Sequence, residues 1–180
     1  MLRKKISVLI LVLSFFLFSY GLSFGEIRVF FSPKGGIAEE IIRQIDNAQG
    51  YIDIAMYSFT YQPIAEAVVE AKHRGVKIRV LMDRVQAQIR SSQYKYLLDN
   101  GIAVAQDRHA GIMHNKIAII DGKVLFVGSY NWSESAEESN QENLLMFVDD
   151  EKIAGEVEEE IIRLYQERLD YLWDFNKSDP

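Results

Sequence analysis

The sequence has no cysteine and only three histidines among its 180 residues. Without cysteine the chain cannot form disulfides, thiolate zinc sites, iron–sulfur clusters or a cysteine nucleophile. Three histidines also leave few ways to build an imidazole metal site. The chain has no internal repeat, low-complexity tract or domain linker. Its length is typical of one domain, and a hydrophobic content of 48% with 12% aromatic residues excludes intrinsic disorder.

Acidic residues outnumber basic ones, with a formal net charge of −6, but the charge is unevenly distributed. Residues 26–133 carry 13 basic and 11 acidic residues, whereas residues 134–180 carry 4 basic and 15 acidic residues. The C-terminal part therefore accounts for nearly all of the acidity. For this reason the net charge does not exclude a partner that bears phosphate groups.

Residues 1–25 have the pattern of a secretory signal peptide. Three basic residues precede an apolar stretch from Ile6 to Phe18, and Ser23 and Gly25 occupy the −3 and −1 positions of a cleavage site. The alternative is an uncleaved membrane anchor, although the apolar stretch is short for a transmembrane helix. Both interpretations place residues 26–180, which we expect to form a single catalytic domain, outside the cytoplasm. Cleavage would give a secreted or periplasmic protein, and an uncleaved segment would anchor it to the membrane.

The rest of the chain alternates between the patterns of strands and helices. Apolar residues at helical spacing predict helices over 37–48, between Thr60 (the expected N-cap) and Gly75, over 92–99, and over 151–173. Short apolar or alternating runs predict strands at 27–31, 51–59, 76–82, 102–105, 112–120, 123–127 and 144–148. This order predicts a layered α/β domain with at least one antiparallel hairpin in its sheet.

The hairpin is predicted by Asp121 and Gly122, which stand between two apolar strands. A two-residue Asp-Gly connection is typical of a type I′ turn. Such a turn places Ile120 opposite Lys123 and sets the register of the whole hairpin.

The open end of this hairpin is predicted to gather polar side chains on one face. In this register Ser129 lies opposite His114, and Lys116 shares the face of His114. If the strand continues, Asn131 lies on the same face. Lys116, Ser129 and Asn131 can donate to phosphoryl oxygens without a metal, and His114 is then available to attack phosphorus. Glu142 is a carboxylate that can hold the tautomer of His114.

His114, Lys116 and Asp121 form the spacing HxKxxxxD, which Gly128-Ser129 and Asn131 follow. This pattern resembles the signature of the phospholipase D superfamily. Nearly the whole chain from residue 26 resembles the small single-motif bacterial endonucleases of that superfamily. The resemblance implies a mixed sheet flanked by α-helices on both faces, a covalent phosphohistidine intermediate, and no metal or other cofactor.

The same resemblance assigns roles to these residues. It makes His114 the catalytic histidine, while Lys116, Ser129 and Asn131 bind the phosphate. Glu142 would orient His114. Asp121 and Gly128 belong to the motif as structural residues, which agrees with the place of Asp121 in the turn.

Other residues leave two interpretations open. His73 is expected on the surface, whereas His109 either lines the cleft or lies in a solvated loop. Trp132 either stacks on a base or packs beneath its loop. The acidic runs 137–138 and 149–151 are expected to be solvated helix caps rather than metal ligands.

The sequence therefore predicts a metal-independent phosphodiesterase, with nonspecific cleavage of DNA or RNA as the leading hypothesis. The alternatives are a phospholipase D that hydrolyses phospholipid headgroups and a non-catalytic phosphate-binding module. Because the chain has one HxKxxxxD motif, we expect a homodimer in which two copies of His114 form one composite active site. The alternative is a monomer in which His109 or water is the general acid.

Overall fold

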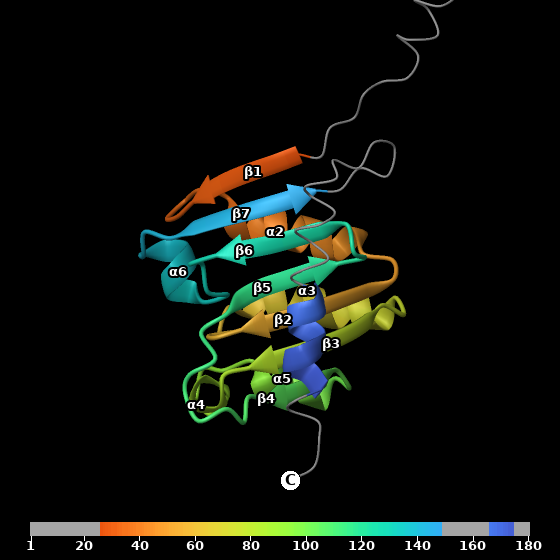
Figure 1. Cartoon of the computed structure of the whole chain (residues 1–180). Coiled ribbons are helices and arrows are strands. Elements are labelled where there is room, and N and C mark those ends of the chain that lie inside the picture. Colours follow the sequence, from red (N-terminus) through yellow and green to blue (C-terminus); the bar gives the residue numbers. More distant parts are fainter. Residues whose placement is uncertain (1–25, 149–165, 175–180) are drawn as a thin grey trace, which may run out of the picture.

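The computed structural model describes residues 26–148 and 166–174. They form a seven-stranded sheet in the order β1-β7-β6-β5-β2-β3-β4 (Figure 1). The strands are β1 (Glu26–Phe31), β2 (Tyr51–Met56), β3 (Lys77–Met82), β4 (Ala103–Gln106), β5 (Lys116–Ile120), β6 (Val124–Gly128) and β7 (Asn143–Val148). β2, β3 and β4 run parallel, and all other neighbouring strands are antiparallel, so the predicted mixed sheet is confirmed.

Helices cover both faces of this sheet, as predicted. The labelled helices are α2 (Ile37–Asn47), α3 (Gln62–His73), α4 (Arg84–Ala87), α5 (Tyr94–Asp99) and α6 (Glu134–Glu138). α2, α3 and α5 pack on one face, and a C-terminal helix over residues 166–174 lies on the other (Figure 1). Of the predicted helix over 151–173, only residues 166–173 belong to the described part of the chain. The predicted signal peptide also lies outside it.

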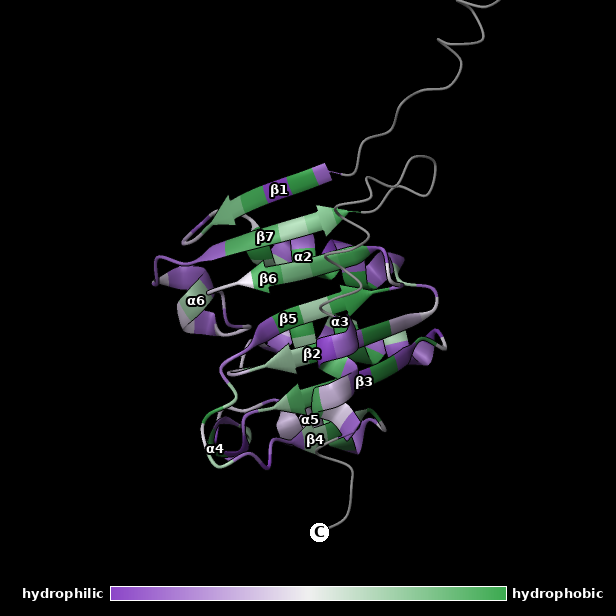
Figure 2. Cartoon of the chain, in the orientation of Figure 1, coloured by the Kyte–Doolittle hydropathy of each residue, from purple (hydrophilic) through white to green (hydrophobic). Residues whose placement is uncertain are grey.

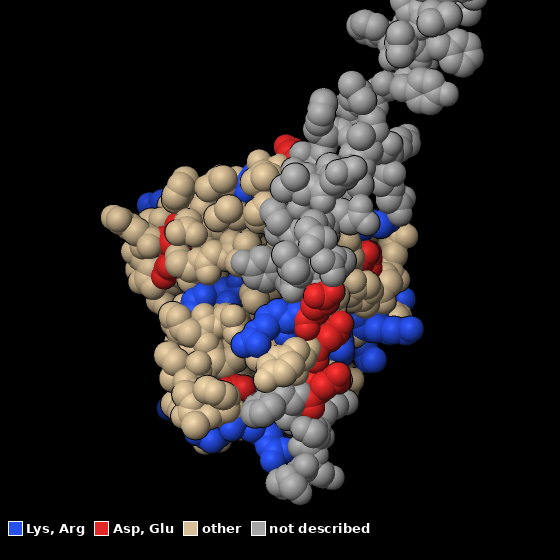
Figure 3. All heavy atoms as spheres, in the orientation of Figure 1, with Lys and Arg blue, Asp and Glu red and all other residues tan. Residues whose placement is uncertain are grey.

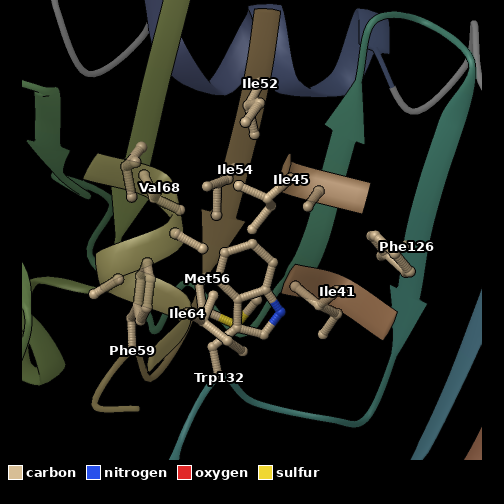
Figure 4. Close-up of a cluster of buried hydrophobic side chains, with 14 of the residues drawn as sticks. Ile41, Ile45, Ile52, Ile54, Met56, Phe59, Ile64, Val68, Phe126 and Trp132 are labelled. Carbon is tan, nitrogen blue, oxygen red and sulfur yellow. The ribbon is translucent and has the colours of Figure 1, made fainter. Parts of the chain in front are cut away.

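The larger core lies between the sheet and the face formed by α2 and α3. Ile41 and Ile45 of α2 recur one helical turn apart and are fully buried. Figure 4 shows them beside Trp132, whose side chain is only 1% exposed and meets the ring of Phe59 edge to face at 5.0 Å. Trp132 is therefore a core residue, and it does not stack on a base.

A smaller core occupies the opposite face. Leu169 and Leu172 of the C-terminal helix are buried there against strand residues that include Ile117 and Ile119. Central strands are thus covered on both faces, which explains their nearly continuous apolar sequences (Figure 2).

The predicted register of the hairpin is wrong by one residue. Ile120 pairs with Val124, so three residues rather than two connect β5 and β6. Asp121 and Gly122 have φ values of 55° and 67°, as a type I′ turn requires, and the amide of Lys123 closes the turn on the carbonyl of Ile120 at 2.9 Å. Lys123 is the additional residue that shifts the pairing.

Two further boundaries differ from the prediction. β5 begins at Lys116 instead of residue 112, because Met113 donates its amide hydrogen bond to the carboxylate of Asp83 instead of to a strand. α3 begins at Gln62 after an N-cap at Tyr61, so Thr60 does not cap it.

Candidate active site

The candidate site lies at one edge of the sheet. β2, β3 and β6 end at this edge and β5 and β7 begin there, at the left in Figure 1. The chain segments directly beyond these strand ends carry the polar residues that the sequence singled out. Antiparallel pairing of β5 with both β2 and β6 therefore gathers residues far apart in the sequence.

His114 and Lys116 meet at the ring of Tyr57, which directly follows β2. The ring centroids of His114 and Tyr57 are 4.5 Å apart at 65°, and Nζ of Lys116 lies 4.8 Å from the centroid of Tyr57. Nζ of Lys116 also donates a hydrogen bond of 3.0 Å to the carbonyl of His114. The structure thus brings the two predicted residues together, with His114 exposed and Lys116 only 6% exposed.

Burial changes the acid–base behaviour of Lys116. Desolvation lowers the pKa of this ammonium group, and the nearby carboxylate of Glu142 acts in the opposite direction and raises it. Lys116 is therefore a partly desolvated cation at the site edge, where its field on a bound anion is stronger than in water.

Ser129 and Glu142 form a direct pair. The hydroxyl of Ser129 donates to Oε2 of Glu142 at 2.6 Å and accepts from the amide of Asn143 at 3.0 Å. Oε1 of Glu142 accepts from Nδ2 of Asn140 at 3.1 Å. Within the described residues, the hydrogen bonds of this carboxylate come from Ser129 and Asn140, whereas the sequence analysis expected Glu142 to hold His114.

The corrected register also changes the position of Ser129. Its amide donates to the carbonyl of Asn143, the first residue of β7, at 3.1 Å, so Ser129 continues towards β7 and does not lie opposite His114. Gly128, just before it, lies so close to β7 that a Cβ atom there would be 2.3 Å from the carbonyl oxygen of Asn143. Glycine is therefore required at position 128 for the close approach of β6 and β7.

Asn131 is oriented by a backbone group. Its Oδ1 accepts a hydrogen bond of 3.3 Å from the amide of Ser58, two residues after the end of β2. The Nδ2 group of the same side chain therefore points away from Ser58 and can donate to a phosphate oxygen.

Asp121 lies at the opposite edge of the sheet, at the far end of β5. Its Oδ1 accepts from the amides of Gly50 and Tyr51 at 2.7 and 2.8 Å, and its Oδ2 accepts from the amide of Gln49 at 2.9 Å. These contacts fasten the hairpin turn to the start of β2. They are the contacts of a structural residue, the role that the sequence analysis gave it.

Asp83 is a buried carboxylate that no sequence motif marks as part of the site. It is 3% exposed and follows β3. Its Oδ1 caps α4 through the amides of Val85 and Gln86, and its Oδ2 accepts from the amide of Met113 at 3.1 Å. Asp83 therefore fixes the backbone immediately before His114. The one feature of the sequence that could have marked Asp83 as a site residue is its position directly after an apolar strand.

The two remaining histidines are exposed. His73 lies on α3 with Nδ1 3.6 Å from Glu70, and His109 accepts a hydrogen bond from the amide of Gly111 at 3.0 Å. His109 lines a pocket next to the segment that carries His114.

Glu137, expected to be a solvated cap, is buried and accepts a hydrogen bond from the hydroxyl of Tyr130. In the described part of the chain, no three His, Asp or Glu side chains group so as to hold a metal ion.

Comparison with known proteins identifies the family. Residues 41–165 match the family model described as "Cardiolipin synthase, PLD-like domain", and the chain belongs to this phospholipase D superfamily. The fold is similar to the crystal structure of Nuc from Salmonella typhimurium, a phospholipase D family member. The TM-score is 0.74 at 28% identity, and the match covers 83% of this chain and 95% of Nuc.

Two sequence relatives carry lipid-related names. The mitochondrial cardiolipin hydrolase of Chlamydomonas reinhardtii and a phospholipase D of Rickettsia prowazekii are each 35% identical over 133 residues, or 74% of this chain. The matched region spans 56% and 64% of these two relatives, respectively.

Proposed function

We propose that this protein is a metal-independent phosphodiesterase that acts through a phosphohistidine intermediate, and that its substrate is DNA or RNA. The observation that carries the proposal is the convergence of the exposed His114 ring and the buried Lys116 ammonium on Tyr57. An exposed imidazole beside a desolvated cation is suited to attack a phosphodiester that the cation has bound.

The proposed reaction has two displacements at phosphorus. A ring nitrogen of His114 forms a bond to phosphorus while the bond to the leaving alkoxide breaks, and a general acid protonates the alkoxide. Water then attacks the phosphohistidine, which releases the phosphomonoester and regenerates His114. Lys116, Ser129 and Nδ2 of Asn131 donate to the phosphoryl oxygens as negative charge increases on them.

The general acid is proposed to be His114 of a second copy of the chain. In the described residues, His73 forms its contact with Glu70 on α3, and His109 has its Nδ1 engaged by Gly111. A two-fold axis near His114 brings this residue close to its own copy, because an isologous interface repeats the same surface. One imidazole would then act as the nucleophile and the other as the general acid.

Nucleic acid is the proposed substrate on the basis of the similarity to Nuc over 95% of that chain. The names of the cardiolipin hydrolase and phospholipase D relatives favour a second candidate, the hydrolysis of phospholipid headgroups. Secretion or periplasmic localisation rests on the sequence pattern of residues 1–25. The helices within residues 26–148 and 166–174 include none with the length and hydropathy of a transmembrane segment.

The test is hydrolysis in excess EDTA, with plasmid DNA, RNA and a phospholipid panel as substrates. Wild type and His73→Ala, a change at an exposed histidine outside the site, should both cleave nucleic acid, and His114→Ala should be inactive. Activity that EDTA removes and one divalent ion restores would contradict the mechanism. Cleavage of phospholipid alone would establish the second candidate, and binding without any turnover would indicate a phosphate-binding module.

Mixing tests the composite site. Wild type that exchanges subunits with excess His114→Ala should lose activity faster than dilution predicts, because mixed dimers hold one catalytic histidine. Activity proportional to the wild-type fraction, from a monomeric species, would contradict the dimer.

A further inference from the structure

A pocket of about 240 Å³ lies beside the segment that carries His114. Met113 and Asn115, the residues on either side of His114, line one wall, and Arg168 and Tyr171 of the C-terminal helix line another. The pocket therefore adjoins the chain segment that carries the proposed nucleophile.

The wall formed by the helix presents a flat, charged surface. The guanidinium carbon of Arg168 lies 5.1 Å from the ring centroid of Tyr171, and the Tyr171 side chain is 59% exposed. Figure 3 shows Lys and Arg atoms next to the C-terminal helix on this face of the molecule. Exposed aromatic rings with an arginine beside them are the stacking surfaces on which proteins bind unpaired bases.

An ion-pair network holds the C-terminal helix in place on the side of the helix away from Arg168 and Tyr171. Arg79 pairs with both carboxylate oxygens of the buried Asp53 and with Oδ1 of Asp170 at 2.7 Å. Nε2 of Gln166 donates to Asp53 at 2.9 Å. Gln166 and Asp170 are one helical turn apart and bind side chains of β2 and β3, so this network fixes the rotation of the helix about its axis, and with it the direction of Tyr171.

The remaining walls combine apolar and hydrogen-bonding groups. Ile112 is largely exposed and Met113 is buried, whereas Asp107, His109 and Asn115 supply polar atoms. A nucleobase has this combination of an apolar face and a polar edge. An acyl chain could form no hydrogen bond with these polar groups, whereas the edge of a base can.

We propose that this pocket binds the base of the nucleotide adjacent to the scissile phosphate, with Tyr171 as its stacking platform. This inference rests on the proposed nuclease function and adds a base-binding subsite to it. The enzyme would cleave without regard to sequence, because stacking accepts any base, but it would require a base at that position.

The test uses short single-stranded oligonucleotides with one cleavable phosphodiester, all other linkages being methylphosphonates. Four substrates are compared. The first has natural bases on both sides of this linkage, the second has an abasic residue on the 5′ side, the third has one on the 3′ side, and the fourth has abasic residues on both sides. For wild type, one of the two single abasic substitutions should lower kcat/KM about tenfold, the effect of one stacked base.

Tyr171→Ala should remove this discrimination and should cleave the doubly abasic substrate as fast as wild type does. Tyr171→Phe should retain the discrimination, since its ring still stacks. Tyr96→Ala, a change at an exposed tyrosine of α5, is the matched control and should behave as wild type. Equal melting temperatures would show that Tyr171→Ala is folded.

Failure of the inference is distinguishable from failure of the proposed function. If wild type cleaves all four substrates equally, or if Tyr171→Ala keeps the discrimination, the base-binding pocket is wrong and the phosphodiesterase proposal stands. If wild type cleaves neither these substrates nor plasmid DNA or RNA, or hydrolyses only phospholipid, the nuclease proposal and this inference are both overturned.

Discussion

The hydroxyl of Ser129 and the carboxylate of Glu142 are joined by a hydrogen bond of 2.6 Å. The pair brings a negative charge near Lys116, the cation that would bind phosphate. Glu142 therefore has two effects that oppose each other at the site. It positions the Ser129 hydroxyl and raises the pKa of Lys116, but its charge also repels an anionic substrate.

Removing the charge of Glu142 should shift the pH dependence of the reaction. In Glu142→Gln the pKa of Lys116 should fall further, because burial lowers it and the opposing carboxylate charge is gone. Lys116 would then lose its proton at lower pH, and the alkaline limb of the kcat/KM profile should move towards acid. Glu138→Gln, at an exposed neighbouring glutamate, is the control. An unchanged alkaline limb in Glu142→Gln would show that Lys116 does not control it.

Replacing Lys116 should separate activity from stability. Lys116→Met should lower turnover by roughly two or more orders of magnitude through lost stabilisation of the phosphoryl charge. It should leave the melting temperature at pH 7 equal to or above that of wild type, because an apolar side chain replaces a largely buried charge. A clearly lower melting temperature would contradict this.

The pH dependence of stability provides a second measurement on Lys116. Its pKa is lowered in the folded state, so the unfolded chain binds more protons in the window just below the ordinary lysine pKa of about 10.4. The stability of wild type relative to Lys116→Met should therefore rise with pH in that window. Denaturant titrations at pH 7 and pH 10 measure this difference.

Asp121→Asn should destabilise the fold without inactivating the folded enzyme. An amide can supply only one of the two acceptor oxygens that bind the amides of Gln49, Gly50 and Tyr51. The expected loss is about 1–3 kcal/mol of unfolding free energy, measured by denaturant titration. Asp99→Asn, which alters an exposed ion pair with Lys95, should cost less. Loss of kcat at an unchanged melting temperature would give Asp121 a direct role in catalysis.

The sequence was sufficient to predict most strands and the motif residues. Apolar runs such as 51–56 and 77–82 are the buried strands β2 and β3, and the Asp121-Gly122 pair marks the turn. The exact register was not predictable from the turn residues alone. Lys123 is added to the connection after Asp121-Gly122. The carboxylate of Asp121 in this turn binds the backbone about 70 residues earlier in the chain. Local turn statistics contain no information about such a contact.

The parts of the site that were missed depend on the order of strands in the sheet. Tyr57 and Asp83 contact the His114 segment because β2 pairs with β5 on one side and with β3 on the other. The sequence predicted the strands but gave no pairing order, so neither residue could be placed beside His114. The expected contact between Glu142 and His114 relied on the place of Glu142 just before a strand and on the family resemblance, and in the structure Glu142 instead accepts a hydrogen bond from Ser129.

The last prediction concerns Asp83 as a positioning residue. Asp83→Asn can keep Oδ1 as the cap of α4, but it places an NH₂ group against the amide of Met113 and removes that hydrogen bond. The backbone before His114 should shift, and kcat should fall roughly 10- to 100-fold, as misplacement of a catalytic group by about 1 Å does. KM should change little, because Lys116 remains in β5.

Ser92→Ala is the control for Asp83→Asn, since it removes a comparable side-chain acceptor of a backbone amide at the start of α5. Both variants should lose some stability, measured by thermal unfolding, but only Asp83→Asn should lose kcat at temperatures where both are folded. Asp83→Glu, which keeps the carboxylate on a longer side chain, should recover part of the lost kcat. If Asp83→Asn keeps the wild-type kcat, the hydrogen bond to Met113 stabilises the loop without positioning His114.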